Sequence, residues 1–351
     1  MSTTLSTSTP PGSGLQPTTR RSLLRHVTGT KLRWAAAVIG GFLLTYPLSD
    51  YELFRLSQVT TTALAVGSLV LLTGMSGQIS AGQGAIFGLG AYTTAVLMDH
   101  GGWGWVPAVL AAGVVTFVVG LILSVPALRL GPLHLGLVTL TFAVLMPLIA
   151  TRWQSVTGGT FGLSLAPVHS PAGLHLSDAQ FLYVVTFAVM MACLGFAAWW
   201  TRGRTGRALA ALRSNPIMAR TQGVDTKRLS IMVFTLATTM AGLGGALNAL
   251  VLQSAIPDSY PFVFSLSLLT GAVVGGVRSW VGAVIGGAYI VYVPSFASEL
   301  ATSRSGGQWA QVISAALLLT ALYFAPAGLA GIGARVARLF HRRPVAARAT
   351  H

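Results

Sequence analysis

The sequence predicts an all-α membrane protein with about ten transmembrane helices. Charged residues make up only 8% of the chain and the mean hydropathy is +0.71, whereas about one quarter of the residues in a soluble domain are charged. Apolar runs of about 20 residues, the length that crosses a bilayer as a helix, recur along the sequence. Such a chain cannot cover itself with a polar surface, so lipid is the expected solvent for most of the fold.

Hydropathy indicates a transmembrane domain over 33–327, flanked by a basic, disordered segment at 1–32 and a basic tail at 328–351. The first predicted span is short, and only Arg278 and its neighbours separate two of the others, so eight or nine spans are the alternatives to ten. The ten segments are 33–49, 57–73, 80–98, 106–126, 133–151, 181–200, 231–252, 263–277, 280–297 and 308–325.

The net charge of +15 could suggest a nucleic-acid partner, but the basic residues gather at the ends of predicted spans rather than along one groove. If the N-terminus is inside, every lysine and arginine except Arg55, Arg152 and Arg304 falls on the inner side. This asymmetry predicts a multi-pass protein of the plasma membrane with both termini in the cytoplasm. We expect no nucleic-acid partner.

Neither an enzyme active site nor a metal site is indicated. The chain has one cysteine, Cys193, and its seven histidines lack the spacing of metal-ligand motifs. Its only lysines, Lys31 and Lys227, do not lie in a phosphate-binding GxxxxGK[ST] loop. We therefore predict no catalytic, cofactor or metal residues, and any ATP must be hydrolysed by another chain.

Two other transport classes fit the spans poorly. No predicted span has an acidic or basic residue near its centre, although ion-coupled carriers usually need such groups. A passive channel would need a selectivity filter or a charged ring, and no suitable repeated motif is present.

Neutral polar residues and glycines mark the spans instead. The glycine run at 74–92 predicts either a broken helix beside a pathway or close helix packing, and both alternatives stay open. A similar run at 282–289 suggests an inverted repeat. Candidate residues of a translocation path are Ser76, Gln78, Ser80, Gln83 and Asn248. Candidate helix-packing positions are Gly84, Gly88, Gly90, Gly282 and Gly286.

The loop at 201–229 is predicted to carry a short helix over 216–222 outside the membrane. Asn215 is a good N-cap, Pro216 suits the first helical position, and Gly223 suits a left-handed C-terminal end. This helix could present apolar side chains to a neighbouring protein or lie on lipid headgroups. On the opposite side, 152–180 is expected to form an irregular cap or a short surface helix.

Three runs, at 77–92, 206–247 and 271–288, resemble the second membrane subunit of branched-chain amino-acid ABC importers. The resemblance covers about 57–327. It implies a permease with a second permease subunit, two cytoplasmic ATP-binding subunits that use the ATP, and an extracytoplasmic substrate-binding protein. Branched-chain amino acids are the implied substrates, and urea or short amides, carried by close relatives, are the alternative.

The resemblance also implies roles for particular segments. The run 218–223 is similar to the family's ATPase-docking loop, although Ser214 stands where many relatives carry an acidic residue, and Ser68 replaces a frequent asparagine. Glycine faces containing Gly84, Gly88 or Gly286 are expected to contact the second permease, and 152–180 with 253–263 to meet the binding protein. The predicted coupling residues are Asn215, Pro216, Ile217, Met218, Ala219, Arg220 and Gly223.

Overall fold

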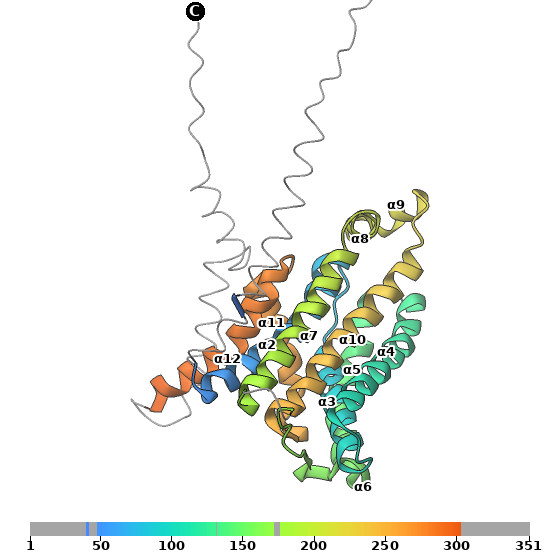
Figure 1. Ribbon diagram of the computed structural model, residues 1–351. Helices are drawn as coiled ribbons and strands as arrows, with labels where there is room; N and C mark the ends of the chain where they lie inside the picture. The colour runs from blue at the N-terminus through green and yellow to red at the C-terminus, as the bar shows by residue number, and fades with distance from the viewer. Residues whose placement is uncertain (1–39, 42–47, 131, 172–175, 303–351) are drawn as a thin grey trace, which may run out of the picture. The chain divides into compact units, whose positions relative to one another are not determined.

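The structure, a computed structural model, describes residues 40–41, 48–130, 132–171 and 176–302. The predicted span 308–325, most of 33–49, and the terminal segments 1–32 and 328–351 lie outside these residues. The chain divides into two units between Pro47 and Leu48, and every labelled helix belongs to the second (Figure 1).

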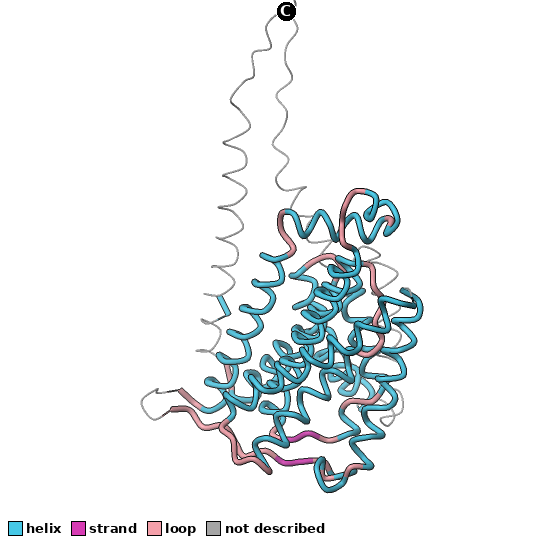
Figure 2. Tube along the Cα trace, turned by 90° about the vertical axis from the view of Figure 1, so that its right-hand side faces the viewer, coloured by secondary structure: helices cyan, strands magenta, loops and turns pink. Residues whose placement is uncertain are grey.

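The described chain is almost entirely helical, with one two-stranded sheet (Figure 2). The helices are α2 (Asp50–Leu69), continued by the π-helix η1 (Val70–Ser76), α3 (Gln83–Asp99), α4 (Trp105–Leu130), α5 (Pro132–Arg152), α6 (Gln154–Thr157), the 3-10 helix η2 (Gly159–Phe161), α7 (Asp178–Trp200), α8 (Arg204–Ser214), α9 (Pro216–Thr221), α10 (Thr226–Leu252), the 3-10 helix η3 (Pro257–Ser259), α11 (Phe262–Gly275) and α12 (Trp280–Thr302). The strands are β1 (Leu163–Ser164) and β2 (Ser254–Ala255).

Within the described residues, six helices are long and apolar enough to cross a membrane. The predicted spans 80–98 and 263–277 form shorter helices, α3 with 17 residues and α11 with 14. The predicted span 57–73 begins earlier, at Asp50, because Ser49 and Glu52 form a capping box that starts α2 in polar sequence. Hydropathy does not detect such a start, since it registers only apolar residues.

Helices α2 and α10 form the centre of the bundle, with most of their residues buried, whereas α4, α5, α7 and α12 expose one face. Glycines bring α3 and α10 into backbone contact: a Cβ at Gly90 would overlap the carbonyl oxygen of Gly242, and one at Gly245 that of Phe87. Small residues at a crossing allow two helix backbones to approach this closely.

The expectation that Gly84, Gly88 and Gly286 face a second permease is wrong, because all three pack inside this chain. A Cβ at Gly84 would overlap Ser265 on α11, and one at Gly286 would overlap the Gly271 carbonyl. Small-residue faces look the same in sequence whether the neighbouring helix lies in the same chain or in another. A Cβ at Gly88 would meet Met146 and Tyr260, and one at Gly282, another predicted packing position, would meet Gly275.

The segments that the sequence places outside the bilayer lie at opposite ends of the bundle. Helices α8 and α9 are at one end, whereas α6 and the strands are at the other (Figures 1 and 2). The strands pair antiparallel, with Leu163 opposite Ala255 and Ser164 opposite Ser254. The two predicted external segments, 152–180 and 253–263, thus join in one cap, which is mostly irregular within the described residues.

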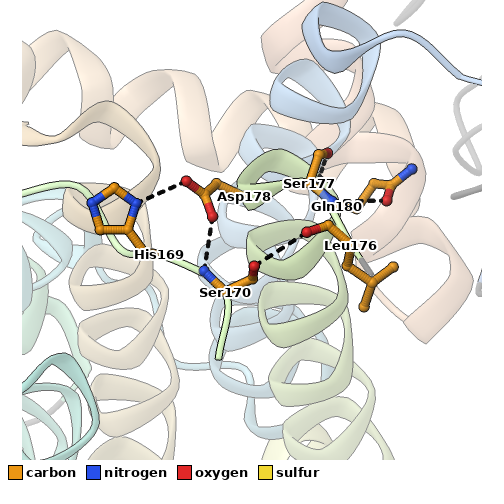
Figure 3. A network of polar contacts seen from close by, with 6 residues as sticks. All are labelled: His169, Ser170, Leu176, Ser177, Asp178 and Gln180. Carbon is orange, nitrogen blue, oxygen red and sulfur yellow. Dashed lines mark hydrogen bonds and ion pairs between the residues drawn. The ribbon is translucent and has the colours of Figure 1, made fainter. Parts of the chain in front are cut away.

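Asp178, at the start of α7, holds the end of this cap (Figure 3). One oxygen of its carboxylate accepts a hydrogen bond from the Ser170 backbone N–H at 2.8 Å, and the other lies 2.9 Å from His169 Nδ1. The preceding Ser177 caps α7 and also donates to Asp50 Oδ1 at 3.1 Å. These contacts fix the cap to the starts of both α7 and α2.

Candidate functional site

The glycine run after α2 does break the helix. The π-helix η1 widens the last turns, and Gly77 adopts a left-handed conformation with φ of 75°. Residues 77–82 then run without helical structure until α3 begins at Gln83. We call residues 77–82 the break. The break itself is therefore confirmed, whereas the path beside it stays a prediction, and Gly84 and Gly90 are closely packed, as the second alternative expected.

Side chains of neighbouring helices satisfy part of the backbone at the break. The Ala81 N–H donates to Thr139 Oγ1 on α5 at 3.2 Å, and the Gly84 N–H donates to Ser265 Oγ on α11 at 3.1 Å. Thr73 Oγ1 donates to the Gln78 carbonyl at 3.2 Å. Irregular backbone at membrane depth persists only where protein groups satisfy it or where it lines a cavity. The break is thus a specifically supported feature.

Two buried polar atoms at the break have no hydrogen-bond partner among the described residues: Ser80 Oγ and Gln83 Nε2. Gln83 is 1% exposed, and its other amide atom, Oε1, accepts a hydrogen bond from Ser68 Oγ at 3.3 Å. A buried donor without an acceptor costs about 1–3 kcal/mol. Buried polar groups are otherwise nearly always paired, so this donor at the first residue of α3 is an exception that calls for an explanation.

The five candidate path residues do not form one cluster. Ser76, Gln78, Ser80 and Gln83 follow one another along the break, whereas Asn248 lies on α10. Both ends of the Asn248 amide are bonded elsewhere: Nδ2 donates to Thr61 Oγ1 at 3.2 Å and Oδ1 accepts from the Tyr260 hydroxyl at 3.5 Å. Asn248 therefore ties α10 to α2 and to the segment before α11.

The loop at 201–229 contains two helices, whereas the sequence analysis predicted one. The additional helix, α8, is amphipathic and buries Leu209 and Leu212. The three-residue spacing of these leucines is typical of an amphipathic helix, but a long hydropathy window does not detect a helix this short.

Helix α9 forms as predicted, one residue shorter than the expected 216–222. Asn215 Oδ1 accepts hydrogen bonds from the N–H groups of Ile217 and Met218, at 3.0 and 3.2 Å. Gly223 has φ of 79°, which confirms its left-handed conformation. The N–H groups of Gly223 and Val224 donate to the carbonyls of Arg220 and Ala219, so the helix ends in a Schellman motif.

The large apolar side chains that α9 exposes are those of Ile217, 74% exposed, and Met218, 63% exposed. Ala219 is only 1% exposed, so its side chain packs inside the chain and offers no surface to a partner. The expectation that Ala219 fits a partner's groove is therefore wrong, because this residue lies on the inner side of its helix. Arg220 Nε donates to Thr226 Oγ1 at 2.9 Å and holds α9 against the start of α10.

One contact that the sequence analysis missed links the loop to the break. Arg213, near the end of α8, donates a hydrogen bond from Nη1 to the carbonyl oxygen of Gly74 in η1. Its stem covers Gly77, where a Cβ would come within 3.0 Å of Arg213 Cγ. No sequence signal identified this pair, because the two residues are far apart in the chain. A hydrogen bond and a packing contact thus join the end of α8 to the start of the break.

Comparisons with known proteins agree on one family. Residues 53–322 match the family model described as branched-chain amino acid transport system / permease component. The high-affinity branched-chain amino acid transport system permease protein LivM of Escherichia coli is 28% identical over 74% of this chain, and that of Salmonella typhimurium is 27% identical over the same share. The chain spans 65% of the length of these LivM relatives.

The permease protein LivH of Escherichia coli, from the same kind of system, is 26% identical over 81% of this chain and 98% of its own length. Among solved structures, PsaBC from Streptococcus pneumoniae aligns over 82% of this chain and 95% of its own, with a TM-score of 0.40 and 13% identity. That likeness is too low to support an argument about this chain.

Proposed function

We propose that the chain is the membrane-spanning permease subunit of an ATP-driven, binding-protein-dependent importer. The reason is that it belongs to the family of branched-chain amino acid transport permease components. The observation that carries this proposal is the family match over 53–322. Branched-chain amino acids are the proposed substrates, since the relatives are permeases of branched-chain amino acid systems. Urea or short amides are the alternative within the same class.

The proposed assembly contains this chain, a second permease, two cytoplasmic ATP-binding subunits and an extracytoplasmic binding protein. Two kinds of permease, LivM and LivH, are similar to this chain, which supports pairing between related subunits. We place the complex in the plasma membrane with both termini in the cytoplasm. Ten spans require 33–49 and 308–325 in addition to the helices described, and an inverted repeat would relate the two halves.

Helix α9 is the proposed docking element for an ATP-binding subunit. Its capped ends make it rigid, and Ile217 and Met218 project from it. The adjoining α8 contacts the break through Arg213 and Gly74. Movement of a docked ATPase would thus pass from α9 to α8 and on to the break, where the proposed translocation path begins.

The external cap is the proposed contact surface for the binding protein. Among the described residues of the cap, the most exposed large apolar side chain is that of Phe161, 92% exposed, which lies in η2. Strand pairing and Asp178 hold this cap in place. A large aromatic residue held on a rigid surface is typical of a protein contact.

Gln83→Met tests the proposed path at the break. Methionine fills a similar volume and removes the unpartnered Nε2, so we expect unchanged or higher thermal stability and unchanged abundance in the membrane. If Gln83 binds substrate in transit, ATP-dependent leucine uptake should fall about 2- to 10-fold, the effect of losing one hydrogen bond.

Asn248→Leu is the matched control, because both ends of that amide are bonded within the chain. It should lower stability by about 1–3 kcal/mol, because the buried Tyr260 hydroxyl loses its acceptor and Thr61 keeps only its bond to the Gln58 carbonyl. A stability loss in Gln83→Met as large as that in Asn248→Leu, or normal leucine uptake by Gln83→Met, would exclude Gln83 from the path.

A further inference from the structure

A cavity of about 270 Å³ lies where the loop helices α8 and α9 meet the ends of the spans. Residues of the break form one wall, and the first turns of α10 form another. Ser124 of α4 and Leu135 of α5 also line it. The cavity therefore belongs both to the proposed cytoplasmic surface and to the membrane-spanning helices.

Three basic side chains line this cavity: Arg213, Arg220 and Lys227. None of the described lining residues is acidic. The nearby Asp225 caps α10 and pairs with Arg228 at 3.1 Å, so it is engaged outside the cavity. The cavity therefore concentrates positive charge without an internal counter-charge, which favours an anionic ligand.

The donors in this cavity are only partly used. Arg213 and Arg220 each have one recorded hydrogen bond, to Gly74 and Thr226, which leaves further guanidinium N–H groups. Lys227, within the described part of the chain, has no recorded partner. Ammonium and guanidinium groups around a small cavity match the oxygens of a phosphate.

Other walls of the cavity are apolar. Ile231 and Phe234 of α10, Leu135 of α5 and Leu212 of α8 line it. An acyl chain could follow these side chains while a headgroup occupies the basic end. A partner's carboxylate would not need this apolar surface.

We propose that this cavity binds the phosphate of an anionic phospholipid from the inner leaflet. The positive-inside pattern places 201–229 at that leaflet, and basic pockets between spans at the cytoplasmic side suit anionic headgroups. A lipid bound there contacts α8, α9, α10 and the break at once. It thereby holds the docking loop against the spans, whichever substrate is transported.

The test is a thermal titration of the full chain, purified in neutral detergent and followed by fluorescence-detected size exclusion. Short-chain phosphatidylglycerol, short-chain phosphatidylcholine and inorganic phosphate are added separately. We expect phosphatidylglycerol to raise Tm and phosphatidylcholine to have no effect. A rise with phosphate alone would show that the site also takes the free anion, whereas a rise only with phosphatidylglycerol would show that it needs the lipid.

Lys227→Gln and Arg220→Gln assign the effect to the cavity, and Arg204→Gln is the control because Arg204 lies on the same loop but outside the cavity. Each cavity variant should weaken the apparent affinity for phosphatidylglycerol about five-fold, whereas Arg204→Gln should leave it unchanged. Equal shifts with both lipids, or equal affinity in all three variants, would overturn the proposal. A Lys227→Gln variant that keeps its lipid response but no longer co-purifies with an ATP-binding subunit would instead assign the cavity to that partner.

Discussion

Gly223→Val is expected to reach the membrane in normal amounts and to lose about 90% or more of ATP-dependent uptake. Gly223 has φ of 79°, and no heavy atom lies within 4 Å of a Cβ placed there, so the cost of valine is purely conformational. That cost is about 1–2 kcal/mol, which is equivalent to a factor of about 5–30, or about ten near the middle of this range. Because the loop lies outside the bundle, the strain should disturb the end of α9 and its docking while leaving the spans intact.

Gly223→Asn is the matched control, because asparagine adopts the left-handed conformation more readily than other residues with a side chain. It should retain most of the uptake. Uptake and membrane abundance would be measured for both variants in the same cells. Equal uptake by the valine and asparagine variants would mean that the Schellman end of α9 is not needed for transport.

Arg213→Met is expected to separate ATP hydrolysis from transport. Methionine keeps an apolar stem over Gly77 but removes the donor to the Gly74 carbonyl. A hydrogen bond from a charged group is worth about 1.5–3 kcal/mol, so the transport per ATP hydrolysed should fall about 10- to 100-fold. The ATP-binding subunit should still bind, because Ile217 and Met218 remain exposed on α9.

Arg207→Met, on the exposed face of α8, is the control and should leave the ratio of transport to hydrolysis unchanged. The measurement is leucine uptake and phosphate release from the same proteoliposomes. If Arg213→Met lowered uptake only in proportion to hydrolysis, the contact with Gly74 would not transmit movement to the break.

Sequence reasoning succeeded where structure depends on near neighbours in the chain. The cap at Asn215, the left-handed Gly223 and the break after Gly77 follow from the chemistry of single residues and their immediate neighbours. The start of α2 was missed, although its capping box is visible in the sequence, because hydropathy does not register Ser49 and Glu52.

Contacts between distant segments could not be predicted from the sequence. A glycine face does not reveal which helix covers it, so Gly84 and Gly286 were assigned to another subunit although they pack inside the chain. A short helix does not reveal which side it buries, and Ala219 was therefore placed on the wrong side of α9. The contact between Arg213 and Gly74 depends on how α8 folds back on η1, which no local pattern encodes.

We propose that this chain provides the translocation path and that ATP-binding subunits drive its conformational change through α8 and α9. The most direct measurement is leucine uptake by proteoliposomes containing the chain with its second permease, both ATP-binding subunits and the binding protein, omitting one component or ATP at a time. We expect leucine uptake only when every protein and ATP are present. Leucine uptake by this chain alone, without ATP or the binding protein, would contradict the proposal that ATP-binding subunits drive transport.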